Sequence, residues 1–208
     1  MKVYTAAQMR EQEQAAVARG SSFEQLMENA GQAAAADILR LIPRAGRALI
    51  VCGKGNNGGD GLVVARVLQE QGWQADIVFA LGENLSPLAQ NNRLRLAGLE
   101  GIRFFGLDEL PACLNTACYD LIIDGIFGTG FTGSLPGAIA AACRLLNPAR
   151  GLKIALDIPT GLDCDTAQAD ADTFRADITY AFAARKPAHV HPKGQDFCGK
   201  IICLDIGI

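Results

Sequence analysis

The sequence predicts an α/β fold in which helices cover both faces of a doubly wound, mostly parallel sheet, giving three αβα layers. Seven short apolar runs have the length of strands, and the nearly continuous run at 119–124 is typical of a strand buried on both faces. Segments with apolar residues at helical spacing alternate with these runs. A glycine-rich turn at 53–61 directly follows the first strand, and this arrangement is Rossmann-like.

Two helices are predicted ahead of the first strand. Thr5-x-x-Gln8 is a capping box that begins the first helix, and Gly20 ends it. Ser22 caps the second helix, which stops before Pro43. We expect this pair to offer an apolar face.

The remaining elements alternate along the chain. The first strand is predicted at 47–52 and is followed by a helix over 62–71, which Asp60 or Gly61 opens. Ser86-Pro87 is a cap followed by proline at the first helical position. Further strands are predicted at 75–81, 102–105, 119–124, 152–156, 178–182 and 200–204, and further helices at 88–97, 109–115 and 138–146. With no internal repeat or low-complexity linker, we expect one domain over 1–208.

Composition excludes several classes of protein. The net charge is −3 with scattered Lys and Arg, which argues against nucleic acid as a partner. No apolar run approaches the ~18 residues of a membrane span, and the chain starts with a polar helix rather than a signal peptide. We therefore expect no membrane partner and a cytoplasmic location. The seven cysteines lack a C-x-x-C pair and are expected to be reduced thiols, mostly buried.

The glycine-rich turn has the spacing G-x-G-x-x-G at Gly53, Gly55 and Gly58. Its backbone N–H groups, with the start of the next helix, can hold an anion such as a pyrophosphate. An ordinary dinucleotide site places an acidic residue at the end of the next strand, but here that strand ends in Ala80-Leu81-Gly82. A P-loop would carry Lys and then Ser or Thr where this chain has Gly59-Asp60. Neither familiar motif fits well.

The longer string Gly-Lys-Gly-Asn-Asn-Gly-Gly-Asp-Gly resembles the signature loop of the YjeF N-terminal domain family, the NAD(P)H-hydrate epimerases. Segments 124–130 and 155–163 resemble the second and third motifs of that family, in the expected order. Residues 26–31 and Lys186-Pro187 also agree, so the resemblance covers nearly the whole chain. It implies epimerisation of the R and S forms of hydrated NADH and NADPH, in the repair of nicotinamide nucleotides.

The resemblance also implies the residues of the site. A potassium ion would be held by Asn57, Asp124 and Thr160. The hydrated dinucleotide would contact Asn56, Asn57, Gly58, Gly59, Asp60, Gly128, Thr129, Gly130, Phe131, Thr132, Gly133, Ser134 and Asp157.

The residues themselves support part of this assignment. Asp124 follows four apolar residues at a strand end, where a carboxylate needs a partner, and a hard cation is a natural one. Asp60 is explained equally well as an N-cap without a ligand.

Asp157 is the predicted catalytic residue. Inversion at C6, the carbon of the hydrated nicotinamide ring that bears the hydroxyl, can proceed by loss of the hydroxyl to give an iminium or by ring opening. Both routes require proton transfer at the hydroxyl oxygen. A carboxyl group can act as the acid and the base for either route. Asp163 and Asp165 are alternatives that read more naturally as turn residues. The pair His189 and His191 has no third ligand nearby, so we expect a surface or lid role rather than a metal site.

The sequence leaves two other functions to be considered. Some members of the family are protein-interaction domains, so a nucleotide-binding or protein-binding module without catalysis is an alternative. An ordinary nicotinamide dehydrogenase is disfavoured because the ribose-binding acid is missing. The resemblance further implies a fused or separate ADP- or ATP-dependent dehydratase as partner, and a homodimer.

Overall fold

The computed structural model describes residues 2–208, and its centre is a single sheet. The strands are β1 (Arg47–Cys52), β2 (Gln74–Phe79), β3 (Ile102–Gly106), β4 (Leu121–Gly125), β5 (Leu152–Leu156), β6 (Ile178–Phe182) and β7 (Lys200–Leu204). They lie in the order β3-β2-β1-β4-β5-β6-β7, and every neighbouring pair is parallel. The strand order reverses between β1 and β4, and in sheets of this kind ligands bind outside the strand ends at that point. The doubly wound fold is confirmed.

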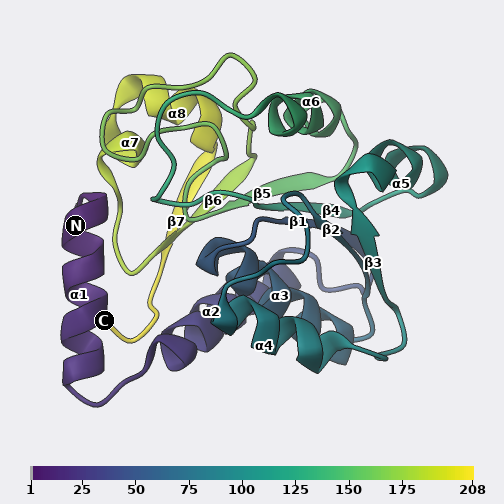
Figure 1. The fold of residues 1–208 in the computed structure, drawn as a ribbon, viewed down its shortest axis with the longest axis horizontal. Helices are drawn as coiled ribbons and strands as arrows, with labels where there is room; N and C mark the ends of the chain where they lie inside the picture. The colour runs from purple at the N-terminus through teal and green to yellow at the C-terminus, as the bar shows by residue number, and fades with distance from the viewer. Residues whose placement is uncertain (1) are drawn as a thin grey trace.

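Helices cover both faces of the sheet, as Figure 1 shows. They are α1 (Ala6–Ala18), α2 (Phe23–Leu41), α3 (Asn56–Glu70), α4 (Pro87–Leu96), α5 (Leu110–Thr116), α6 (Gly137–Leu146), α7 (Pro187–Val190) and α8 (Pro192–Cys198), with a 3₁₀ turn at Leu107–Glu109. Helices α2, α3 and α4 lie on one face, and α5 and α6 lie on the other. None of the helices in residues 2–208 has both the length and the apolar character needed to cross a membrane.

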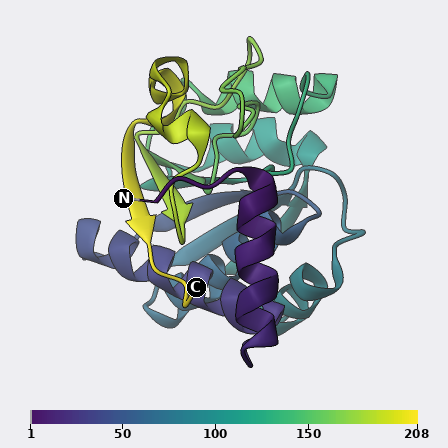
Figure 2. The ribbon, with the colours of Figure 1, turned by 90° about the vertical axis from the view of Figure 1, so that its left-hand side faces the viewer.

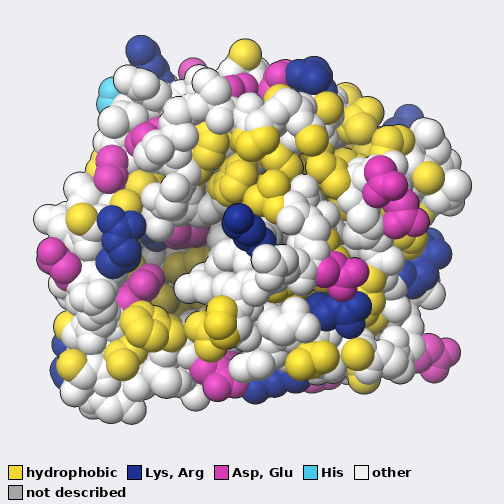
Figure 3. All heavy atoms as spheres, viewed as in Figure 1, with side chains coloured by type: hydrophobic (Ala, Val, Ile, Leu, Met, Phe, Trp, Pro, Cys, Tyr) yellow, Lys and Arg dark blue, Asp and Glu magenta, His cyan; other side chains and the backbone are white. Residues whose placement is uncertain are grey.

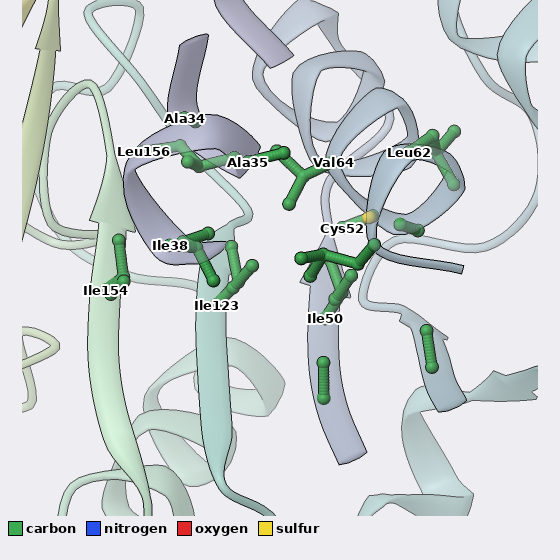
Figure 4. Packing of buried hydrophobic residues seen from close by; sticks show 14 of the residues in the cluster. Ala34, Ala35, Ile38, Ile50, Cys52, Leu62, Val64, Ile123, Ile154 and Leu156 are labelled. Carbon is green, nitrogen blue, oxygen red and sulfur yellow. The ribbon is translucent and has the colours of Figure 1, made fainter. Parts of the chain in front are cut away.

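The larger hydrophobic core lies between the sheet and helices α2 and α3. Ile50, Ile123 and Ile154 project from three adjacent strands toward the helices, where they meet small residues of α2 such as Ala34 (Figure 4). Small side chains on α2 allow its backbone to approach α3 closely, and a Cβ on Gly31 would overlap Val63. The layer that carries the glycine-rich turn is therefore tightly packed.

The start of α3 corrects the prediction from sequence. The helix begins at Asn56, with Gly55 as an N-cap that offers no side-chain hydrogen bond, and not at Asp60 or Gly61. Asp60 is therefore not an N-cap but a buried residue of the second turn. The glycine-rich segment was interpreted as a loop because Asn and Gly favour turns, but the tight contact with β1 and β4 holds it as helix.

Two short helices, α7 and α8, were not predicted. Each has proline at its start, and each is too short to show helical periodicity in the sequence. The other elements begin and end within a few residues of the predicted positions. All seven cysteines are free, and Cys118 and Cys203 are exposed rather than buried.

Helix α1 stands outside the layers, across the end of the sheet (Figure 2). The predicted Thr5–Gln8 capping box begins it. The backbone N–H of Ala6 donates to Asp165 Oδ1 at 2.8 Å, and the N–H of Tyr4 donates to the carbonyl of Arg185 at 2.8 Å. These bonds tie the start of α1 to the segments that follow β5 and β6.

The glycine-rich turn allows a direct test of its packing. A Cβ at Gly58 would lie 2.1 Å from the carbonyl oxygen of Gly53, whereas a Cβ at Gly55 would meet nothing within 4 Å. We expect Gly58→Ala to lower the free energy of unfolding by about 1–3 kcal/mol through overpacking. Gly55→Ala is the matched control and should change it by much less. Urea unfolding measures both; equal losses would contradict this role for Gly58.

Candidate active site

A cavity of about 540 Å³ lies at the carboxyl ends of β1, β4 and β5. Its walls come from the glycine-rich turn, from residues 126–131 after β4, from Asp157 after β5, and from helices α1 and α2. Figure 3 shows a hollow on this face with hydrophobic and acidic atoms at its floor. The three sequence motifs therefore meet in one crevice, as their places at strand ends predicted.

The first wall is the start of α3. Asn56 and Asn57 line the cavity, and no side chain of the described residues caps the first backbone N–H groups of the helix. These free N–H groups and the helix dipole favour an anion at this end of the cavity. Gly58 and Gly59 do not line the cavity; a Cβ on Gly59 would overlap the side chain of Met27. Their glycine character is explained by packing beneath the site.

The second wall is the segment after β4. Residues 128–131 line the cavity, and the ring of Phe131 stacks on Phe127 with 5.4 Å between ring centroids. Thr132, Gly133 and Ser134 are exposed and lie outside the lining. The structure thus brings the first half of this predicted binding segment to the cavity but not the second half.

Asp157 is placed at the end of β5 by an unusual backbone conformation. Its φ is 64°, in the left-handed region that Asp tolerates better than most residues. Its carboxylate accepts a hydrogen bond from Lys186 Nζ, and Lys186 also donates to the carbonyl of Phe182 at 2.9 Å. The Lys186 side chain is only 1% exposed, and its ion pair is with Asp157. This ion pair fixes the direction of the carboxylate in the cavity.

His189 is a buried residue that hydrogen-bonds to the backbone of Asp157. Its Nδ1 accepts the backbone N–H of Lys186 at 3.0 Å, which leaves the proton on Nε2 to donate to the carbonyl oxygen of Asp157 at 2.9 Å. The expected surface or lid role is wrong for His189, because the ring is fully buried. His191 is exposed and caps α8, so the two histidines do not share a site.

Burial of His189 predicts a pH dependence of stability. Desolvation lowers the pKa of the imidazole to about 4, from an ordinary value of 6.5. The folded state then binds fewer protons than the unfolded state between these values, so the stabilisation is present above pH 6.5 and is lost as pH falls towards 4. A shift of this size corresponds to at most about 3 kcal/mol.

Thermal unfolding between pH 4 and 7 measures this dependence. We expect His189→Asn to flatten the pH profile, whereas His191→Asn, which keeps a helix-capping side chain, should retain the profile of the unmodified protein. An unchanged slope in His189→Asn would contradict the prediction.

Two further carboxylates line the cavity, Glu13 from α1 and Asp60 from α3. The pKa of Asp60 is raised well above its ordinary value by burial, and then by the charges of Asp157 and Glu13. The pKa of Glu13 is raised by partial burial, and then by Asp157. Like charges this close favour retention of a proton in the cluster. Sequence reasoning missed Glu13 and the partnership of Lys186; the available signals were an acidic residue at helical spacing between Met9 and Val17, and a Lys-Pro pair.

Asp124 lies beneath the cavity and is fully buried. Its oxygens accept hydrogen bonds from the Oγ1 and backbone N–H of Thr160, both at 2.7 Å, and from the N–H of Ile126 at 3.1 Å. Desolvation nevertheless raises the pKa of Asp124 to about 6, because no basic side chain of residues 2–208 pairs with it. The segment after β4 also packs on Asn57, whose Nδ2 is buried without a partner.

These oxygen donors fit a monovalent cation better than a transition metal. Among the described residues, no three His, Cys, Asp or Glu side chains cluster as a metal site. One buried carboxylate, the Thr160 hydroxyl and the side-chain oxygen of Asn57 are hard oxygen ligands of the kind that alkali ions prefer.

The alternatives Asp163 and Asp165 have structural roles. Asp163 Oδ1 accepts the N–H groups of Asp165 and Thr166, which closes a turn. Asp165 holds the start of α1 through Ala6. Neither lines the cavity, so they are turn residues as the sequence indicated.

Residues 23–188 match the family model described as YjeF-related protein N-terminus. The chain belongs to this family. A relative from Rhodopirellula baltica named NAD(P)H-hydrate epimerase is 38% identical over 183 residues, covering 88% of this chain and 75% of the relative. One of the same name from Elusimicrobium minutum is 35% identical, covering 100% of this chain and 96% of the relative.

Longer relatives and solved structures also match this YjeF-related domain. A bifunctional NAD(P)H-hydrate repair enzyme Nnr from Pyrobaculum aerophilum is 38% identical over 88% of this chain, which spans only 37% of that relative. The crystal structure of yeast ynu0 superposes with a TM-score of 0.77 at 22% identity, covering 99% of this chain and 88% of that one. The structural likeness bears on the fold alone.

Proposed function

We propose that this protein is an isomerase that interconverts the R and S forms of hydrated NADH and NADPH. The observation that carries the proposal is the placement of Asp157, held by Lys186, in a cavity that is also lined by the free N-terminus of α3. Relatives named for this activity share 34–38% identity over most of the chain. The cavity thus offers N–H groups for an anionic pyrophosphate and a carboxylate for proton transfer at the ring.

The chemistry requires only proton transfer. In the iminium route, a carboxylic acid protonates the hydroxyl on C6, water departs with the electron pair of the C–O bond, and the nitrogen lone pair forms a C=N bond. Water then adds to the other face and gives its proton to a carboxylate. In the ring-opening route, a carboxylate takes the hydroxyl proton, C6 becomes an aldehyde as the C6–N bond breaks with its electron pair moving to nitrogen, and the nitrogen is protonated. After rotation, the nitrogen adds back to the other face of the carbonyl with the reverse proton transfers. Asp157 is suitably placed for either, and no electrons are gained or lost overall.

The direct test starts from one purified epimer of hydrated NADH or NADPH. Chromatography should show the other epimer appearing faster with the protein than without it, because these hemiaminals also epimerise unaided. Failure to exceed the spontaneous rate would favour the alternative, a non-catalytic binding module of the same family.

We also propose that potassium binds beneath the cavity, at Asp124, Thr160 and Asn57. The support is the fully buried Asp124 carboxylate, with which no basic side chain of residues 2–208 pairs. A bound cation would neutralise the carboxylate and stabilise the two segments that Asp124 and Thr160 join.

Thermal unfolding in different salts tests this site. We expect potassium to raise the melting temperature above that in choline chloride of equal ionic strength, by an amount equivalent to about 2.7 kcal/mol at one hundred times Kd. Asp124→Asn should be less stable and should need more potassium to recover. Identical melting curves in the two salts would count against the site.

The family context suggests a partner reaction. The bifunctional relatives combine this domain with further sequence, and we propose that a fused or separate ADP- or ATP-dependent dehydratase consumes one epimer. The homodimer and the cytoplasmic location stay predictions.

A further inference from the structure

We propose that Glu13 of α1 is a second catalytic carboxyl group, which acts on the face of the nicotinamide ring opposite Asp157. This inference rests on the proposed epimerase function. It concerns a residue of α1, a helix that lies ahead of the segment matched to the family model.

Inversion at C6 has a geometric requirement that one carboxylate meets poorly. When the hydroxyl leaves from one face and water adds to the other, the acid and the base act on opposite sides of a planar C=N group. A group within hydrogen-bond reach of the oxygen on one face is too far from the oxygen on the other face for direct transfer. An epimerase using this route therefore benefits from a proton-transfer group on each side.

The cavity provides carboxyl groups from different walls. Asp157 comes from the carboxyl end of β5, and Glu13 comes from α1, which crosses the end of the sheet (Figure 2). Hydrogen bonds tie the start of α1 to the segments after β5 and β6, and Met9, Arg10 and Glu13 of the helix line the cavity. Glu13 is half-buried, and its carboxylate has no hydrogen bond or ion pair with residues 2–208.

Asp60 supplies an independent sign that the cavity takes a ligand here. Its side chain faces the cavity, is 9% exposed, and likewise makes no hydrogen bond within the described chain. A buried carboxyl group without a partner is costly unless something satisfies it. The charges of Asp157 and Glu13 both raise the pKa of Asp60, so the three carboxyl groups share one electrostatic environment.

The proton balance closes over one turnover. For the epimer whose hydroxyl lies on the Glu13 side, Glu13 as the acid gives its proton to the departing hydroxyl. The C–O bond breaks with its electron pair going to oxygen, the nitrogen lone pair forms the C=N bond, and water leaves. A second water adds its oxygen to the opposite face and gives its proton to the Asp157 carboxylate. Asp157 then carries the proton that Glu13 lost, which is the state needed for the reverse inversion; exchange with solvent restores the first state.

Water labelled with a heavy oxygen isotope distinguishes reaction on the two faces of the nicotinamide ring. Each epimer of hydrated NADH is incubated separately in this water, and mass spectrometry follows label in the starting epimer and in the inverted one. In Glu13→Gln we expect inversion to slow by roughly 10²-fold, while departure and return of water on the Asp157 face continue to label the epimer whose hydroxyl lies on that face. The ratio of exchange to inversion therefore rises, and it does not depend on the fraction of protein folded.

Glu11→Gln is the control, because it removes the same charge from an exposed position of the same helix, outside the cavity. It should leave the ratio unchanged. An equal loss of exchange and inversion from both epimers in Glu13→Gln, or no loss of either, would overturn the inference. Inversion by the unmodified protein without uptake of label would also overturn it, because the ring would then have opened. A protein that does not invert either epimer would overturn the proposed function itself.

Discussion

Asp157→Asn should slow epimerisation by roughly 10²- to 10⁴-fold, because asparagine keeps the size of the side chain but cannot exchange a proton. Affinity for the substrate should change much less, since the free N–H groups of α3 and residues 128–131 are untouched. The measurement is kcat and KM for one epimer, with the spontaneous rate subtracted.

The matched control is Asp196→Asn, which removes a carboxylate from the exposed surface of α8. It should have full activity. Full activity of Asp157→Asn itself would show that this carboxylate is not the acid or base, and Asp60 would become the next candidate because it lines the same cavity.

Lys186→Met should lower the free energy of unfolding by about 3–5 kcal/mol, the usual loss when one partner of a buried ion pair is removed. Lys186 is 1% exposed and Asp157 is 14% exposed, so the remaining carboxylate would lose its partner in a poorly hydrated place. Urea unfolding measures the loss, and activity should fall as well because the carboxylate is no longer held in position.

The double substitution Asp157→Asn with Lys186→Met tests how strongly the two side chains stabilise each other. It removes both charges, so its loss of stability should be smaller than the sum of the two single losses. Additive losses would show that the two residues do not stabilise each other and that Lys186 does not position Asp157.

Local patterns in the sequence were sufficient for most of the fold. The strands at 47–52 and 152–156 were predicted residue for residue, because apolar runs of this length bounded by turns have few other interpretations. The start of α3 was missed because Asn56 to Asp60 reads locally as a turn. The helix there depends on close approach to β1 and β4, which only the folded chain supplies.

The sequence by itself placed the three motifs together, since the carboxyl ends of parallel strands meet at one side of the sheet, but it did not predict the walls formed by α1 and α2. It identified Asp124 and Asp157 through their positions at strand ends. Only the tertiary structure showed which side chains surround Asp157. Lys186 and His189 lie 29 and 32 residues from it in the sequence, and Glu13 comes from a helix at the start of the chain. Periodicity reports neighbours within one element, whereas the ionisation of a buried carboxyl group depends on charges and burial contributed by several elements at once.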